Sequence, residues 1–323
     1  MARSTWAVFR VTARTLGRRG DGILVFCGPV ILVLLVGTWA LTLTLGTALI
    51  MHPLLGIAIT AQSGGTPTDF VTAMYAGGNS MAIVGTSDFV PRTGWTRMLY
   101  LFNSLVGMSV VSLTLTYIMQ VYTALQQRNL LGLKFHLLSA ETDDAAELVA
   151  RLGARGQSSV GYSDLAELGF GIGQVKEAHH FYPVLFYFRF RQPFYCATWS
   201  AGVALDTVAL IRSALDDESY EWLKESGAVE QLWRASLIVV RTLEETYLRG
   251  GVREPASELS GEVQSRWCYR YQAAVQRLRR AGINTTADEQ AGAETYISLR
   301  SQWEPLTEAL ASAMAHRVDQ LRP

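Results

Sequence analysis

The sequence predicts an all-α membrane protein: two transmembrane helices with a re-entrant helix and loop between them, followed by a helical cytosolic domain. Three observations predict this fold class. Two long stretches carry no charge, the segment between them is too apolar for a free external loop, and charged residues become frequent after Arg128. Apolar residues make up 49% of the chain and charged residues only 17%, which indicates membrane segments rather than a soluble core.

The first uncharged stretch runs from Gly22 to Met51, and the second from Met98 to Gln127. A spanning helix needs about 20 apolar residues, and one charge at its centre costs about 2.5–3.5 kcal/mol. Each stretch therefore predicts a transmembrane helix. A signal peptide is the alternative for the first stretch, but its apolar part is usually only about 7–15 residues long. We expect Pro29 to kink the first helix.

Basic residues beside the two stretches set the expected orientation. Between the stretches only Arg92 and Arg97 are basic, whereas residues 1–21 form a basic N-terminus. Its arginines are Arg3, Arg10, Arg14, Arg18 and Arg19. By the positive-inside rule both termini are cytoplasmic and residues 53–96 lie outside. We therefore expect a multi-pass protein of the cell (inner) membrane that contacts lipid.

The segment between the stretches contains a helix signal. Thr66 is placed as the N-cap, Pro67 as the first helical residue and Asp69 in the first turn. The pattern predicts a short helix over about 67–81. Irregular backbone after such a helix is tolerated at membrane depth only if it is buried in protein or lines water.

The strip "IVGTSD" follows this helix. A helix directs the negative end of its dipole toward the residues after its C-terminus, and rings of carbonyls can replace the hydration shell of a cation. Gly85 lets a carbonyl turn inward, and Asp88 would add negative charge at the outer mouth. The candidate site residues are Ile83, Val84, Gly85, Thr86, Ser87 and Asp88.

In these residues the sequence resembles the two-transmembrane pore-loop potassium channels, whose signature is T-V-G-Y-G-D. The resemblance covers roughly residues 20–128 and continues through Pro91 and Arg97. Gly107 falls where that family commonly has a hinge glycine in its inner helix. The resemblance implies a two-span pore domain over 22–128 with a pore helix and a selectivity filter. It also implies a homotetramer, because one loop cannot ring an ion.

The strip departs from the family signature at three places. Ile83 removes a ring of hydroxyl ligands, Thr86 removes aromatic packing, and Ser87 replaces a glycine. If the backbone at that position is left-handed, serine costs about 1–2 kcal/mol. The resemblance therefore implies a tetrameric channel for potassium or another monovalent cation, with its selectivity and its conduction left open. The alternative is a non-conducting two-span membrane sensor or scaffold that oligomerises the cytosolic domain.

Hydroxyl residues mark one face of the second span. Ser109, Ser112 and Thr116 follow helical spacing. They either line a wet cavity or bond back to carbonyls of their own helix.

Residues 129–323 predict a cytosolic helical domain. A first helix is expected after an N-cap at Thr142, and residues 158–174 are expected to form turns. The aromatic segment 181–195 fits either a helix or a strand. Further helices are expected over 197–215, 228–250, 260–282 and 303–321. In the first of these, Val203, Val208 and Ile211 are expected to point inward.

Other motifs favour no further chemistry. "GFGIGQ" (169–174) is expected to be a loop rather than a phosphate site, and Glu177 with His180 a surface pair rather than half of a di-metal site. The arginines of residues 266–280 predict a solvated helix face, with anionic lipid as the alternative. We expect no enzyme and no cofactor besides the permeating cation.

The net charge bears on nucleic-acid binding, and the cysteine spacing bears on disulfides. The net charge is zero, which predicts no nucleic-acid partner. The three cysteines form no framework and are expected to be reduced thiols. An unknown cytosolic regulator is compatible with the cytosolic domain.

Overall fold

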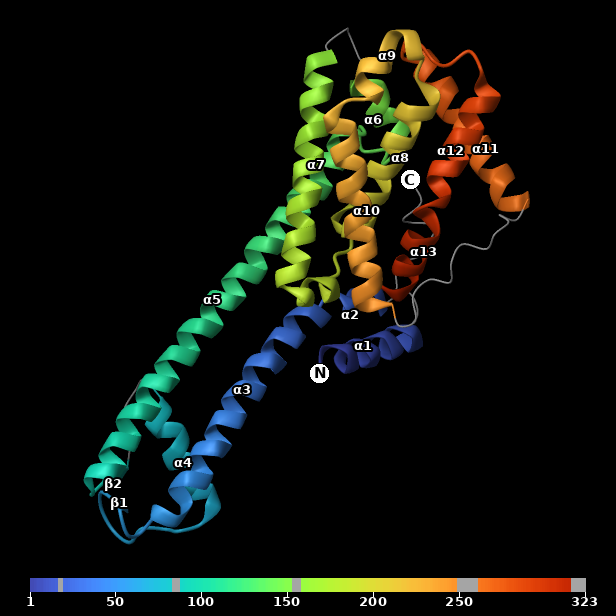
Figure 1. Cartoon of the computed structure of the whole chain (residues 1–323). Coiled ribbons are helices and arrows are strands. Elements are labelled where there is room, and N and C mark those ends of the chain that lie inside the picture. Colours follow the sequence, from blue (N-terminus) through green and yellow to red (C-terminus); the bar gives the residue numbers. More distant parts are fainter. Residues whose placement is uncertain (17–19, 83–87, 153–157, 249–260, 315–323) are drawn as a thin grey trace. The chain divides into compact units, whose positions relative to one another are not determined.

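The chain is mostly helical (Figure 1), which confirms the helical part of the expected fold class. It forms two compact units: the first unit holds residues 1–5 and 29–122, and the second unit holds residues 6–28 and 123–323. The structure, a computed structural model, describes residues 1–16, 20–82, 88–152, 158–248 and 261–314.

Two helices are long and apolar enough to cross a membrane: α3 (Cys27–Met51) and α5 (Gly94–Leu138). Each exceeds the roughly 20 residues that a span requires. Large apolar side chains on both helices are exposed, among them Val33 at 71% and Phe102 at 63%. Such surfaces suit lipid better than water. α5 begins before and ends well beyond the expected range of 98–127.

The start of α3 differs from the expectation. Two short helices precede it, α1 (Ala2–Leu16) and α2 (Gly20–Leu24), and a turn at residues 25–26 separates α2 from α3. The break therefore comes before Pro29 and not at it. Pro29 lies in the first turn of α3, where its missing N–H removes no intrahelical hydrogen bond.

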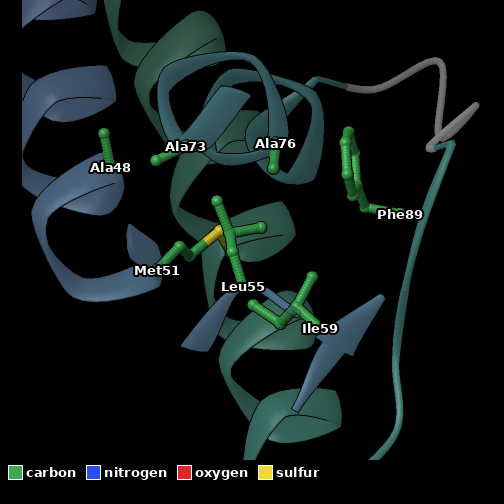
Figure 2. Packing of buried hydrophobic residues seen from close by; sticks show 7 residues of the cluster. All are labelled: Ala48, Met51, Leu55, Ile59, Ala73, Ala76 and Phe89. Carbon is green, nitrogen blue, oxygen red and sulfur yellow. The ribbon is translucent and has the colours of Figure 1, made fainter. Parts of the chain in front are cut away.

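A small core holds the connection between the two long helices together. The sequence did not predict its hairpin, in which β1 (Ile59–Ala61) pairs antiparallel with β2 (Phe89–Pro91), with Thr60 opposite Val90. The hairpin brings the chain back to the start of α5. A helix, α4 (Phe70–Met81), packs beside it. The buried residues that join these elements to α3 are Ala48, Met51, Leu55, Ile59, Ala73, Ala76 and Phe89 (Figure 2).

The second unit is built around α8 (Ala197–Ala214), of which every residue but Arg212 is buried. Val203, Val208 and Ile211 point into the core as expected. α10 and α12 pack directly on α8, and α10 also packs along α7. Besides α2, most of α1 and the end of α5, the described part of this unit contains α6 (Ala145–Leu152), α7 (Ser158–Phe181), α9 (Asp217–Lys224), α10 (Gly227–Tyr247), α11 (Gly261–Arg280), α12 (Glu289–Ser301) and α13 (Glu304–Ala313).

The expected turns at 158–174 are wrong, because this segment belongs to the continuous helix α7. Its glycines serve close packing instead of turns. A Cβ at Gly169 would lie 3.2 Å from the backbone nitrogen of Leu232 on α10, and one at Gly171 would lie 2.7 Å from Leu131 on α5. Missing side chains thus bring neighbouring helices close to α7.

The N-cap expected at Thr142 is also wrong, because α6 begins at Ala145 and the Asp144 carboxylate accepts from the N–H of Ala146 at 2.9 Å. The intervening turn is tight. Ala140, Glu141 and Asp143 all have positive φ, which costs a non-glycine residue about 1–2 kcal/mol.

Partners on both sides hold this turn in place. Asp143 pairs with His136 at 2.5 Å, and the His136 ring stacks on Phe194 with centroids 4.3 Å apart. The end of α5 is therefore fixed in one geometry.

The aromatic segment is neither of the two alternatives expected for it. It forms two 3-10 helices, Pro183–Tyr187 and Pro193–Tyr195, each with a proline in its first turn. Leu185 and Phe186 are buried. The prolines prevent a regular ladder of hydrogen bonds, so burial rather than a repeating backbone pattern fixes the segment.

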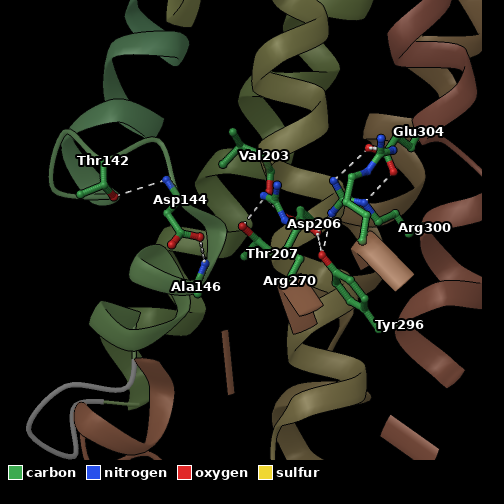
Figure 3. A network of polar contacts seen from close by, with 11 residues as sticks. Thr142, Asp144, Ala146, Val203, Asp206, Thr207, Arg270, Tyr296, Arg300 and Glu304 are labelled. Carbon is green, nitrogen blue, oxygen red and sulfur yellow. Dashed lines mark hydrogen bonds and ion pairs between the residues drawn. The ribbon is translucent and has the colours of Figure 1, made fainter. Parts of the chain in front are cut away.

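A buried charge network centres on Asp206 of α8 (Figure 3). Its carboxylate accepts from Arg300 at 2.5 Å, from Arg270 at 2.9 Å and from the Tyr296 hydroxyl at 2.7 Å. Arg300 also donates to Glu304 at 2.8 Å. Burial alone would raise the pKa of Asp206, but Arg300 and Arg270 outweigh it and hold that pKa below its usual value.

We expect Asp206→Asn to destabilise the second unit by about 3–5 kcal/mol, because it leaves the buried Arg300 and the half-buried Arg270 without their shared anion. In a unit of this size that lowers the melting temperature by roughly 6–20 °C. Thermal unfolding of the full-length protein in detergent, followed by tryptophan fluorescence, would measure this shift in melting temperature. Asp217→Asn, at an exposed carboxylate, is the matched control.

The pH dependence has a definite sign. Because the pKa of Asp206 is lowered on folding, its contribution is complete above the unfolded value of about 3.9 and is lost only in stronger acid. The loss of stability in Asp206→Asn should therefore be fully present at neutral pH. Equal stability of Asp206→Asn and the control at pH 7 would show that the network contributes little.

Candidate functional site

The structure describes both ends of the predicted site but not its middle. Residues 83–87, which hold the candidates from Ile83 to Ser87, lie outside the described residues. Asp88 and Gly107 are described. The site can therefore be built from the helix that leads into the strip, from the strand that leaves it, and from the two long helices around them.

α4 leads into the strip and begins three residues later than the sequence predicts. Its N-cap is Asp69, whose carboxylate accepts from the Thr72 N–H at 2.9 Å and from the Thr72 hydroxyl at 2.7 Å. Thr66, the expected cap, instead accepts from the N–H of Ala61 at 2.9 Å and fastens the loop to β1. The end of the helix at Met81 agrees with the prediction.

The last turns of α4 are held on both long helices. Towards α3, a Cβ at Gly77 would lie 3.2 Å from the backbone nitrogen of Ala48. Towards α5, the buried side chain of Asn103 donates to the Ser80 hydroxyl at 2.9 Å. The end of α4 is thus fixed between α3 and α5 just before the strip begins.

Gly107 has a packing role that the sequence did not predict. A Cβ at this position would overlap the carbonyl oxygen of Met81, the last residue of α4. Glycine is therefore required for the close approach of α4 to α5. The expected role as an inner-helix hinge stays a prediction beside this one.

Asp88 follows the strip in the sequence and is held by α4. The Tyr75 hydroxyl donates to its carboxylate at 3.0 Å, and the Gln62 N–H donates to its carbonyl at 2.7 Å. The Tyr75 ring also meets the edge of Phe89, with centroids 6.2 Å apart. α4 therefore contacts both ends of the strip. Met81 leads into it, and Tyr75 binds Asp88 at its other end.

Sequence reasoning missed Tyr75 and Asn103. Asn103 is buried and needs a partner, because burying an unpaired polar group is costly. Tyr75 is half exposed, and its neighbours in the sequence include other polar residues, so nothing marks it. The partners, Asp88 and Ser80, lie 13 and 23 residues away, so no short spacing signals either pair.

The hydroxyl face of α5 lies on the side turned away from Gly107. Ser109, Ser112 and Thr116 are all exposed. Thr116 donates to the carbonyl of Ser112 at 2.9 Å, which is the back-bonding alternative left open by the sequence.

The remaining candidates form no second site. Among the described residues no group of three or more His, Cys, Asp or Glu could hold a metal ion. Glu177 pairs with Lys176 at 2.7 Å and is exposed, as expected for a surface pair. His180 is exposed as well. The three cysteines are free thiols.

The basic helix α11 is neither a purely solvated face nor a free lipid-binding face. Most of its arginines make ion pairs within the second unit. Arg270 pairs with Asp206, Arg277 with Glu147, and Arg279 with Glu289. These charges tie α11 to α6, α8 and α12.

Comparison with known proteins finds no family model, no curated protein and no solved structure that matches this chain.

We expect Gly107→Ala to destabilise the first unit by about 1–3 kcal/mol, the usual cost of overpacking. Destabilisation would be specific evidence for this contact, since a change from glycine to alanine inside a helix normally stabilises by about 1 kcal/mol. Gly46→Ala on α3 is the control, because no atom lies within 4 Å of a Cβ at that position. Melting curves of the full-length protein in detergent would compare them. Equal curves would show that α4 does not approach α5 at Gly107.

We expect Tyr75→Phe to loosen the outer end of the strip while it keeps the ring contact with Phe89. Loss of one hydrogen bond to a carboxylate costs about 1 kcal/mol at an exposed site, which is roughly a fivefold faster amide exchange. Hydrogen exchange of the peptide that covers residues 83–91 would measure it. Tyr162→Phe in the second unit should leave that peptide unchanged, and so would Tyr75→Phe if Asp88 were not held by α4.

Proposed function

We propose that this chain is one subunit of a homotetrameric cation channel, which conducts ions passively across the cell membrane through a filter of main-chain oxygens. The observation that carries the proposal is the fixed position of α4. Its last turn is held on both long helices at Ser80 and Gly107, and the strip from Ile83 follows directly.

The direction of α4 supports a cation as the permeating ion. The C-terminal end of a helix carries a partial negative charge, and the end of α4 at Met81 leads into the strip. Asp88 adds a full negative charge at the other end, where the Tyr75 hydroxyl orients its carboxylate. Negative charge at both ends of a short strip attracts cations and repels anions.

The proposed ion is potassium or another monovalent cation. A carbonyl filter acts through the backbone, so Ile83, Thr86 and Ser87 do not prevent cation binding by their side chains. They do remove the hydroxyl ring and the aromatic support implied by the resemblance to potassium channels. Strict potassium selectivity is therefore not part of the proposal.

The proposed topology follows from the charges. The arginines before α3 favour a topology with both termini in the cytoplasm and residues 53–96 outside. The second unit is then cytosolic and offers a surface to a regulator. One strip per chain cannot surround an ion, so four copies must contribute.

A second candidate function is a two-span scaffold that only oligomerises the second unit. The three altered filter residues favour it, and so does the extensive core of the second unit around α8.

Ion flux into liposomes that contain the purified full-length protein separates the two functions. For a channel we expect potassium or sodium flux that Gly85→Val abolishes, because a branched side chain blocks the turned carbonyl. Gly173→Ala, where no atom lies within 4 Å of a Cβ, should keep the flux. Chemical cross-linking verifies that each variant is still a tetramer. A tetramer without flux under either gradient would leave only the scaffold.

A further inference from the structure

A small apolar recess lies in the second unit, where α6, α7, α8 and α9 meet (Figure 1). Its volume is about 30 Å³, whereas a small-molecule site usually has about 300–1,000 Å³. None of the described residues that line the recess is charged. It therefore has room for the end of one apolar side chain rather than for a cofactor.

The floor of the recess is buried and its rim is exposed. Val149 of α6, Ile211 of α8 and Leu215 are at most 3% exposed. At the rim, Tyr162 of α7 is 42% exposed and Trp222 of α9 is 47% exposed. Exposed aromatic rings above an apolar floor are typical of pockets that anchor a side chain of a partner protein.

Hydrogen bonds at the start of α9 hold the recess in shape. The Asp216 carboxylate caps the helix and accepts from the Ser219 N–H at 3.0 Å. The Asp216 N–H donates to the carbonyl of Asn284 at 3.2 Å, and the side-chain amide of Asn284 donates to the Ser219 hydroxyl at 3.1 Å. A site that is fixed before binding loses less conformational entropy when it binds.

Acidic side chains flank Trp222 on α9. Glu218 lies four residues before it and Glu225 three residues after it, so the three share one side of the helix. Both glutamates are exposed. Lys224 is the only basic residue of α9, and it pairs with Asp217 at 2.5 Å. The surface beside the rim is therefore negative.

The arginines of α6 and α8 already have other acidic partners. Arg151 on α6 pairs with Glu147 at 3.0 Å. Arg212 on α8 pairs with Glu230 at 2.5 Å. These arginines therefore leave the negative charge of α9 to attract a positive charge from outside.

We propose that the recess is a docking site for a basic peptide segment of a partner protein. One aliphatic side chain of the segment enters between Tyr162 and Trp222, and lysines or arginines beside it meet Glu218 and Glu225. The inference goes beyond the proposed function, since it requires neither ion conduction nor a tetramer.

Fluorescence polarisation of labelled peptides tests the docking site. The full-length protein is held in nanodiscs of zwitterionic lipid, which carries no net charge to attract basic peptides. The probes are RKSLSKR, its relatives with Ile, Val, Met or Phe at the centre, and RKSSSKR. We expect the best apolar centre to bind at least about tenfold more tightly than RKSSSKR, because an apolar side chain leaves water. Equal binding of all the peptides, or binding of none, would overturn the proposal.

Variants of the recess test where the apolar side chain goes. Val149→Ile adds a methyl group to the floor, and we expect it to reduce the preference for an apolar centre at least about threefold with an unchanged melting curve. Trp222→Ser removes one side of the exposed rim and should reduce the same preference. Val263→Ile on α11, outside the recess, is the control. An unchanged preference in both recess variants would contradict insertion.

Charge variants test the sign of the partner. We expect Glu218→Gln combined with Glu225→Gln to weaken RKSLSKR at least about twofold, while the preference for an apolar centre remains. Glu245→Gln combined with Glu262→Gln, at exposed positions of α10 and α11, should leave binding unchanged. Binding of QQSLSQQ as tight as that of RKSLSKR would assign the recess to apolar ligands in general and remove the basic partner.

The docking site and the channel fail separately. Peptide binding to a protein without ion flux would keep the docking site and remove the channel, and flux without peptide binding would do the reverse. Loss of chemical cross-links between subunits in Val149→Ile would assign the recess to another copy of this chain and remove the separate partner.

Discussion

The structure depends on two close approaches of a main-chain carbonyl to a glycine of α5. In the first unit Gly107 meets the carbonyl of Met81, and in the second unit Gly132 meets that of Phe194. In each unit a side chain larger than hydrogen would occupy the space that the carbonyl takes, so glycine sets how closely α5 packs within that unit.

The polar contacts follow a different rule in each unit. Around the strip they are single hydrogen bonds from a neutral donor, such as Asn103 to Ser80 and Tyr75 to Asp88. In the second unit they are clusters of opposite charges, of which Asp206 with Arg300 is the most buried. The difference fits the cost of transferring charges into a bilayer, where neutral donors carry specificity more cheaply than ions.

The sequence predicts the features that depend on long patterns. The uncharged stretches identify α3 and α5, and helical spacing identifies α8 with its inward Val203 and Val208. The sequence fails to predict a local structure where that structure is set by contacts with residues far away in the chain. The glycines of α7 read as turns because their packing partners Leu232 and Leu131 lie on other helices.

For the site, the sequence predicts the end of α4 and singles out Asp88 and Gly107. It cannot predict that Tyr75 holds Asp88, or that Gly107 touches Met81, because neither partner is marked by spacing. The hairpin of β1 and β2 escapes for the same reason, since three-residue strands are too short to show alternation.

The close approach at Gly107 has a mechanical consequence within the first unit. Because the Met81 carbonyl occupies the space of a missing Cβ, α5 cannot turn about its own axis at this point without moving the end of α4. Asn103, one turn earlier on α5, adds a second attachment to α4 through Ser80. A rotation of α5 within this unit would therefore be passed to the end of α4, without slack to absorb it.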